Sequence, residues 1–334
     1  MIIHWWKLAI GLPVLGAALF VGGMELRRSL TASDIEAAWR TEHVTKVTNL
    51  GSTKSLEILP LVNWYARSGD LATEPGVSYL VRTDSSTILF DAGFNPNGLR
   101  PSPLERNMAK LGIDASEIDA VFISHRHRDH VGGVENERSG NISLGASDPL
   151  LKGRTLMGPV PLSHNTMRAS VLSKPGRISE GIATTGPIAR ALFMGKVEEQ
   201  ALVVNVEGRG LVVLVGCGHQ TLLKLLKRMD DAFDQSIYGI VGDLHYPVPE
   251  GRLSYWGIDA QRRLASGGGI FAPISTKEVA SDIALLTKRK PSLVALGSHD
   301  TSDLMLKTFS ERFRSKFRRV EVGVPITLWR PHKE

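Results

Sequence analysis

The chain has 334 residues, 42% of them hydrophobic and 22% charged, with 33 glycines and 17 prolines. This composition is that of an ordinary globular protein and excludes a disordered, collagenous or coiled-coil chain. A single cysteine, Cys217, excludes an intramolecular disulfide and a cysteine-rich zinc module, so a metal site would depend on the ten histidines and on carboxylates. The net charge of +6 includes +4 from the segment beyond residue 300. The rest is nearly balanced, so we expect no nucleic-acid partner.

An uncharged stretch near the N-terminus, residues 8–24, lies between Lys7 and the charged residues Glu25, Arg27 and Arg28. Its length predicts that residues 1–30 are a membrane anchor or a signal segment. No clear small-residue cleavage site precedes Glu25, which favours an uncleaved, single-pass anchor. A buried helix of the folded domain is the alternative. Basic residues flank both ends, so the charge pattern gives almost no indication of orientation.

Short apolar runs and helical patterns alternate through the rest of the chain. We expect a linker over residues 31–55, with a short helix at 33–41, and a domain over residues 56–330. Strands are predicted at 56–62, 77–82, 87–91, 120–124, 201–206, 210–215, 236–241, 293–296 and 320–329. Helices are predicted at 104–111, 220–229, 276–288 and 303–317. Residues 134–200 lack clear periodicity and are expected to form a long connection or an insert over the substrate. Two similar halves predict two sheets covered outside by helices.

Histidines gather directly after the predicted strand at 120–124. His125 and His127 are two residues apart, so on an extended segment they point the same way, while Asp129 and His130 follow where the chain turns. This spacing suits two adjacent metal ions, with two imidazoles for one and a carboxylate and an imidazole for the other. The alternative is a solvated, histidine-rich turn.

Arg126 and Arg128 occupy the variable positions between these candidate ligands. We expect them beside the metal ions, where they would either meet an anionic substrate or remain solvated loop charges.

The segment His-x-His-x-Asp-His at residues 125–130 resembles the metal signature of the metallo-β-lactamase superfamily. The resemblance covers residues 56–328. It implies an α/β fold, built as a four-layer αββα sandwich with one or two metal ions at the ends of two facing sheets. In this chain the sandwich would follow one N-terminal hydrophobic helix.

Four further segments resemble the branch of that superfamily named for dihydropterin ribofuranosyl-aminobenzene phosphate synthase. Residues 73–80 and 88–93 are similar to its opening hairpin, and residues 216–219 and 297–300 to its Gly-Cys-Ser-His and His-Cys-Thr-Gly elements. The resemblance implies that His219 and His299 are distant metal ligands. It also implies that Asp91 is a carboxylate that orients the histidine loop.

The bridging carboxylate of many superfamily members has no direct counterpart here, because the corresponding strand end reads Gly-Cys. Cys217 is therefore either a thiolate ligand or, as we favour, a small buried hydrophobic residue. Asp243 and His245, which follow another predicted strand, are candidates for a substitute carboxylate and an extra imidazole, or they only cap and hydrogen-bond. Asp300 stands where the branch usually has cysteine, and Pro75 where it usually has histidine.

These ligands predict a metal-dependent hydrolase with two divalent metal ions, zinc in the first place and manganese or iron as alternatives. Such ions lower the pKa of a bridging water from about 15.7 to about 7, and the hydroxide attacks an ester, lactone or phosphate ester. Asp129 is the predicted catalytic carboxylate. The alternatives are an iron-dependent redox enzyme on the same fold and a membrane-tethered, non-catalytic binding domain.

The expected partner is an anionic small-molecule or lipid substrate. If the N-terminal segment is an anchor, we expect the catalytic domain on the periplasmic or extracytoplasmic side.

Overall fold

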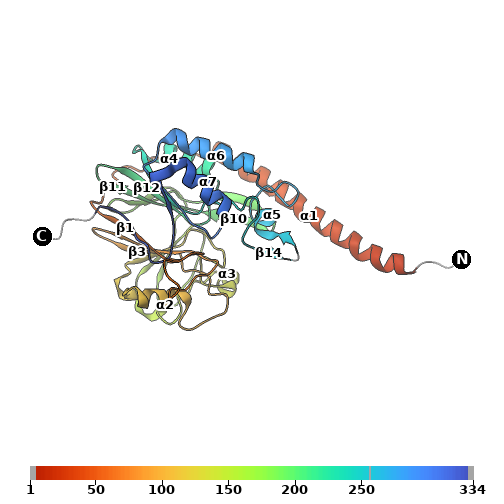
Figure 1. Cartoon of the computed structure of the whole chain (residues 1–334), viewed down its shortest axis with the longest axis horizontal. Helices are drawn as coiled ribbons and strands as arrows, with labels where there is room; N and C mark the ends of the chain where they lie inside the picture. Colours follow the sequence, from red (N-terminus) through yellow and green to blue (C-terminus); the bar gives the residue numbers. More distant parts are fainter. Residues whose placement is uncertain (1–4, 256, 330–334) are drawn as a thin grey trace.

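Two facing seven-stranded sheets form the centre of the protein, and helices cover their outer sides (Figure 1). The computed structural model describes residues 5–255 and 257–329. Each sheet combines an antiparallel part with a parallel part, and the parallel parts carry the predicted site residues at their carboxyl ends.

The first sheet contains the strands of the N-terminal half and the last strand of the chain. In spatial order it consists of β18 (Ile326–Trp329), β1 (Leu56–Val62), β2 (Ser78–Thr83), β3 (Thr87–Phe90), β4 (Ala120–Phe122), β5 (Thr155–Gly158) and β6 (Arg168–Val171). Pairing is antiparallel from β18 to β3 and parallel from β3 to β6.

The second sheet repeats this plan. In spatial order it consists of β17 (Phe317–Arg319), β16 (Leu293–Leu296), β13 (Ile237–Gly242), β12 (Gly210–Val215), β11 (Leu202–Val206), β8 (Ile182–Thr184) and β7 (Gly176–Ser179). Pairing is parallel from β17 to β12 and antiparallel from β12 to β7. Two hairpins lie outside the sheets, β9 (Ile188–Leu192) with β10 (Gly195–Glu199), and β14 (Ser254–Tyr255) with β15 (Ile258–Asp259).

Helices cover the two outer faces. Besides α1 (Trp5–Thr41), the helices of the described chain are α2 (Pro103–Lys110), α3 (Val134–Ser139), α4 (Leu222–Ala232), α5 (Ala260–Leu264), α6 (Thr276–Arg289) and α7 (Asp303–Phe313), with short 3-10 turns at Ala115–Glu117, Asp148–Leu151 and Arg314–Lys316. In Figure 1, α4, α6 and α7 lie over the second sheet and α2 lies under the first. The N-terminus of α2 is set by Ser102, whose hydroxyl accepts a hydrogen bond from the backbone N–H of Glu105.

Strand β1 shows why the layers form. Leu56 and Ile58 belong to the apolar cluster between the sheets, whereas Leu59 and Leu61 belong to the cluster that includes the buried face of α2. Successive side chains of a strand point to opposite faces, so a strand that is apolar at nearly every position is buried on both sides. A third cluster joins the second sheet to α4, α6 and α7. Three apolar layers thus separate four layers of secondary structure, which confirms the expected αββα sandwich.

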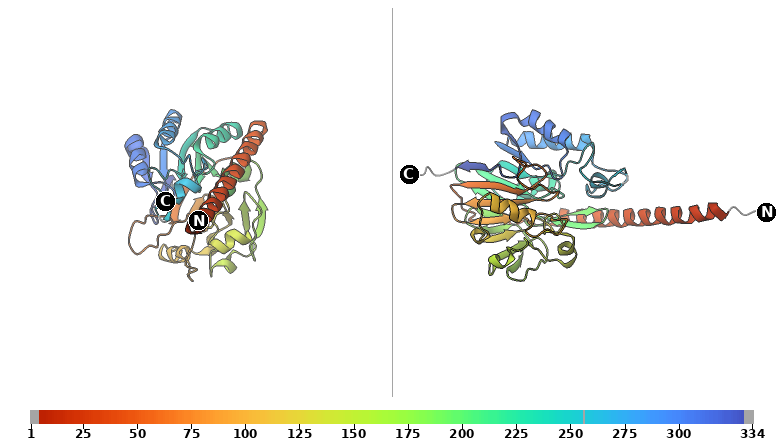
Figure 2. Two further views of the ribbon diagram at one scale, coloured as in Figure 1. Left: turned by 90° about the vertical axis from the view of Figure 1, so that its right-hand side faces the viewer. Right: turned by 60° about the horizontal axis from the view of Figure 1, so that its bottom comes forward.

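The N-terminal helix α1 (Trp5–Thr41) is one continuous element and includes the segment 33–41 that we expected as a separate helix. Figures 1 and 2 show that its N-terminal part extends away from the sheets. Its C-terminal part packs beside the domain. Arg28 donates a hydrogen bond to the carbonyl of Gly267 at 3.0 Å, and the ammonium group of Lys224 lies 5.2 Å from the centre of the Trp39 ring.

The predicted membrane anchor, the membrane partner and the single-pass location are wrong. No helix in the described part of the chain combines the length and the apolar character that crossing a bilayer requires. Within residues 8–24, the side chains of 8–12 and 14 lie outside the described part. The same finding contradicts the membrane tether in the alternative of a non-catalytic binding domain.

Three predicted segments differ from the observed ones. Residues 134–200 are not a long connection, because they contain α3 and the strands from β5 to β10. These strands have three to five residues each, which is too short for a visible alternation of apolar and polar residues. The helix predicted at 303–317 ends at Phe313, after which the chain turns into β17, and the strand predicted at 320–329 begins only at Ile326.

Candidate metal centre

The carboxyl ends of five strands lead into the loops that carry the predicted site residues. In chain order these are Asp91 after β3, His125, His127, Asp129 and His130 after β4, Cys217 and His219 after β12, Asp243 and His245 after β13, and His299 after β16. Strands β3 and β4 are parallel neighbours, as are β12, β13 and β16, so within each sheet the loops start from one edge.

Asp91 holds the histidine loop by three contacts. Its Oδ1 accepts a hydrogen bond from the backbone N–H of Ser124 at 2.7 Å, and its Oδ2 accepts one from the Ser124 hydroxyl at 2.7 Å. The same Oδ2 lies 2.7 Å from Nδ1 of His130. These are the contacts expected of a carboxylate that orients the loop, and they direct Nε2 of His130 toward Cys217, whose Sγ lies 3.0 Å away.

The loops bring potential ligand atoms from both sheets together in three overlapping groups. Within each group the ligand atoms lie within 4.8 Å of one another. The groups are Asp129, His130, Cys217 and His299; His125, Cys217 and His219; and His219, His245 and Asp300. His127 adjoins the second group, because its Nδ1 lies 3.0 Å from Nε2 of His125. The structure thus brings together all the side chains that we predicted as ligands, while their binding of metal remains a prediction.

Burial and charge divide the imidazoles into two kinds. Burial holds the pKa of His125 and of His219 well below the usual value and lowers the pKa of His127 to about 4. Burial also opposes the charged forms of His130 and His299, but nearby carboxylates outweigh it and raise both pKa values, that of His299 to about 9. Three imidazoles are therefore neutral at pH 7 and offer a nitrogen lone pair, as a metal ligand must.

Asp129 lies between His130 and His299, the two histidines whose pKa is raised. Its Oδ2 is 2.7 Å from Nε2 of His299 and 3.4 Å from Nε2 of His130. Burial would raise the pKa of Asp129, but these two histidines hold it well below the usual value. Its side chain is 18% exposed, so it reaches the surface of the site.

Asp243 and Asp300 take different parts in the second sheet. Oδ1 of Asp243 accepts a hydrogen bond from the Thr301 hydroxyl at 3.0 Å, which is the capping contact that we considered as its alternative role. Oδ2 of Asp300 lies 3.1 Å from Nδ1 of His245. Asp300 therefore joins His245 at the site, although it was not among the predicted ligands.

A further observation shows that these residues fit a metal ion. Three buried polar atoms of the site have no hydrogen-bond partner within the described chain, namely Oδ2 of Asp243, Nε2 of His245 and Nδ1 of His299. A buried polar atom without a partner is costly, and coordination to a cation is one way to satisfy it. Imidazole and carboxylate groups are ligands that zinc, manganese and iron accept.

Glu199 is a site residue that the sequence analysis missed. It ends β10, is fully buried, and accepts hydrogen bonds from the backbone N–H groups of Cys217 and Gly218 at 2.9 Å and of His219 at 2.7 Å. Burial raises its pKa to about 7, against these hydrogen bonds. Glu199 lies in the segment without clear periodicity and has no motif around it, so only its position in space indicates its role.

A cavity of about 330 Å³ opens over the ligand groups. Its polar lining consists mainly of predicted site residues, among them His127, Asp129, His219 and His299. Its apolar lining includes Phe94, Leu192, Met194, Leu253 and Leu264. The cavity has the size and the mixed lining of a small-molecule site.

Two facing sheets, outer helices and a histidine-rich site at the carboxyl ends of parallel strands define a metallo-β-lactamase fold. The sequence pattern described as the metallo-beta-lactamase superfamily matches residues 71–140, which include the histidine loop. These comparisons support a member of this superfamily, and the expectation of an enzyme of this fold is confirmed.

Known proteins resemble the chain over different lengths. The 7,8-dihydropterin-6-methyl-4-(beta-D-ribofuranosyl)-aminobenzene-5'-phosphate synthase of Methanocaldococcus jannaschii is 23% identical over 317 residues, which cover 82% of this chain and 97% of that protein. Lactamase-like protein nscB of Trichophyton equinum is 29% identical over 180 residues, 51% of each protein. The crystal structure of Tm1679, described as a metal-dependent hydrolase of the beta-lactamase superfamily, superimposes with a TM-score of 0.56 at 20% identity and covers 81% of this chain and 98% of that one.

Proposed function

We propose that this protein is a hydrolase that depends on two divalent metal ions, preferably zinc, and cleaves an ester, lactone or phosphate ester. The observation that carries the proposal is that six imidazoles and three carboxylates, from loops of both sheets, lie together at one edge of the sandwich. They belong to the three groups described above or directly contact a member of these groups. A cluster of this density, beside a cavity of small-molecule size, is what a two-metal hydrolytic site requires.

We assign two ligand sets. His125, His127 and His219 would hold one ion, and Asp129, His130 and His299 would hold the other. Cys217 contributes its sulfur atom to two of the three groups, so it would lie next to both ions. His245, Asp243 and Asp300 are further candidates, because two of these side chains carry buried atoms without a partner in the described chain. When bound, such ions polarise a carbonyl or phosphoryl oxygen and lower the pKa of water from about 15.7 to about 7.

The protein's own groups have separate tasks in this scheme. Asp91 and Glu199 hold the two ligand loops from opposite sheets, so that the imidazoles keep their positions. Asp129 is the partly exposed carboxylate of the site, and we assign it to accept and steer a proton of the reaction. The apolar wall of Phe94, Leu192 and Leu264 would exclude water from one side of the substrate.

The test is elemental analysis of the purified full chain, with His127→Ala and His219→Ala as site variants. His43→Ala is the matched control, because His43 is exposed and lies before the first strand. We expect about two equivalents of zinc or manganese in the wild type and in the control. We expect a clear loss of metal in both site variants.

Turnover is measured on the same preparations with 4-nitrophenyl butyrate and bis(4-nitrophenyl) phosphate. Hydrolysis that falls with the metal content would support the proposal. A wild-type chain that binds no metal would overturn it. Bound iron with a visible absorption band would favour the redox alternative instead.

A further inference from the structure

A second cavity, of about 340 Å³, lies beside the first one. The two cavities share the lining residues His127, Glu137, Leu192 and Met194. Of the predicted metal ligands, His127 alone lines the second cavity. A ligand that fills it therefore stays next to the proposed reaction site without occupying the ligand groups.

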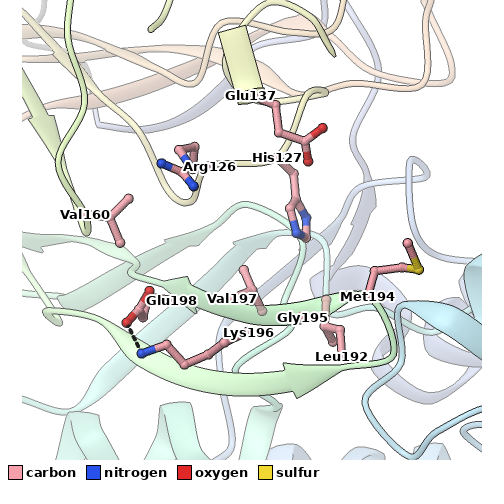
Figure 3. A pocket seen from close by; sticks show the side chains of 10 residues that line it. All are labelled: Arg126, His127, Glu137, Val160, Leu192, Met194, Gly195, Lys196, Val197 and Glu198. Carbon is pink, nitrogen blue, oxygen red and sulfur yellow. Dashed lines mark ion pairs between the residues drawn. The ribbon is translucent and has the colours of Figure 1, made fainter. Parts of the chain in front are cut away.

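The second cavity lies between the histidine loop and the β9–β10 hairpin. Figure 3 shows Arg126, His127 and Glu137 on one side, and the hairpin residues from Leu192 to Glu198 on the facing side. Leu192 and Val197 are buried in the hairpin, so this wall is supported by packing.

The charges that line this cavity are partnered, with one exception. Lys196 lies 2.5 Å from Glu198, and the other acidic residue, Glu137, lies 2.9 Å from Arg128. Arg126 has neither an ion pair nor a side-chain hydrogen bond within the described residues, although it is bracketed by two of the proposed ligands. The cavity thus keeps one uncompensated positive charge, which favours an anion and disfavours a cation.

The surroundings of Arg126 leave room for its side chain. Gly140, at the end of α3, has a φ of +75°, and a Cβ atom there would lie 3.6 Å from Nη1 of Arg126. This distance is an ordinary van der Waals contact, and a residue other than glycine would be strained at this position by the positive φ. The planar, forked guanidinium group matches the two oxygens of a carboxylate or phosphate.

We propose that Arg126 is the anion-binding residue of a substrate subsite, which holds a carboxylate or phosphate group of the substrate that does not itself react. This inference rests on the proposed function, because it names the class of molecule that the same site would take. The substrate is then an amphiphilic anion, with an apolar part against Leu192 and Met194 and an oxyanion group on Arg126.

The test is calorimetric titration of the full chain, with its metal content measured, by three aromatic probes that it cannot hydrolyse as esters. Benzoate carries a carboxylate, phenylphosphonate a phosphate-like group, and benzamide no charge. Arg126→Gln is compared with Arg138→Gln, which removes the same charge from an exposed arginine of α3 that lines neither cavity. Arg126→Lys keeps the charge and removes the fork.

We expect Arg126→Gln to weaken the binding of at least one anion by about tenfold or more, the usual effect of a lost charge-assisted hydrogen bond. Arg138→Gln should leave that affinity within about twofold, and Arg126→Lys should lie in between. Benzamide should bind all variants alike. The anion whose affinity falls more in Arg126→Gln indicates whether the substrate carries a carboxylate or a phosphate group.

Equal effects of Arg126→Gln and Arg138→Gln, or none from Arg126→Gln, would overturn the inference. Because these titrations need no turnover, the subsite and the proposed hydrolase activity can fail separately. Metal binding and hydrolysis without any response to Arg126 would reject the subsite alone. A selective response to Arg126 in a chain without metal would reject the hydrolase alone.

Discussion

Oε2 of Glu199 accepts a hydrogen bond from the backbone N–H of His219 at 2.7 Å, and the other carboxylate oxygen accepts two more from the residues just before. Across the site, Asp91 holds the histidine loop of the first sheet in a similar way. Each ligand loop is thus fixed by one buried carboxylate, Asp91 directly after β3 and Glu199 at the end of β10, and these two contacts are the main structural support of the proposed centre.

Replacing Glu199 by glutamine is expected to weaken zinc binding by about 10- to 100-fold, the usual cost of losing an outer partner of a ligand. The amide presents a donor where three N–H groups need an acceptor. The neighbouring Glu198→Gln is the control, because Glu198 forms an ion pair with Lys196 and contacts neither ligand loop within the described residues. Zinc affinity is measured by competition with a chelator. Equal affinities in the two variants would show that Glu199 has no part in holding the loop.

Removal of the metal is expected to lower the Tm. An ion that binds only the folded protein stabilises it, and several buried carboxylates and imidazoles face each other when it is absent. Thermal unfolding of the full chain is followed before and after treatment with a chelator, and again after zinc is added back. In His219→Ala the chelator should have a smaller effect. An unchanged Tm in the wild type would contradict a resident metal ion.

Arg228→Met is expected to lower the free energy of unfolding by about 1 to 3 kcal/mol, because it leaves the carbonyl of the buried Thr185 without the hydrogen bond from Arg228 and Glu42 without its ion-pair partner. Two nitrogens of the fully buried Arg228 side chain reach Glu42 and the carbonyl of Thr185, at 2.6 to 2.8 Å. Arg289→Met is the matched control, because two nitrogens of Arg289 donate hydrogen bonds to the carboxylate of Asp230 at the surface. This substitution should lower the free energy of unfolding by about 1 kcal/mol or less. Urea unfolding measures both, and equal losses would contradict the difference in burial.

Asp84→Asn is expected to destabilise the protein at neutral pH but not in acid. Slight burial would raise the pKa of Asp84, but hydrogen bonds from Ser55, Lys54 and Thr53 outweigh it and lower the pKa to about 2. Because the pKa is lower in the folded state, the stabilisation is fully present above about pH 4 and is lost as the pH falls to about 2. Asp84 is exposed, so the loss at pH 7 should be about 1 kcal/mol or less.

The measurement for Asp84 is urea unfolding of the wild type and the variant between pH 2 and pH 7. Their difference should shrink toward low pH. A difference that stays constant over this range would mean that the charge of Asp84 contributes nothing through these hydrogen bonds.

Local signals were sufficient for much of the fold and the first half of the site. The strands at the centre of both sheets are apolar at consecutive positions, and α2 and α6 begin at capping residues that can be read in the sequence. His125, His127, Asp129 and His130 fall within six residues. Their proximity needs no tertiary information, because the chain itself keeps them together.

Other features depend on contacts between distant segments. Glu199 meets the loop after β12, and Arg228 meets Glu42, 186 residues away, and no local pattern encodes either pair. Arg126 and Arg128 have the same motif context, and only the position of α3 pairs one with Glu137 and leaves the other to the cavity. The short strands between residues 155 and 184 form because the sheets supply their partners.

The chemistry of the centre was therefore readable from residue types and spacing, since metal ligands must be imidazoles and carboxylates and four of them are sequence neighbours. The full set of residues at the centre could not be read from the sequence in this way. His219, His245, His299 and Asp300 join the histidine loop because parallel strands end at a common edge of each sheet, and the sheets face each other with those edges together. That arrangement follows from packing apolar faces across the whole chain, which is a property of the folded molecule and not of any one segment.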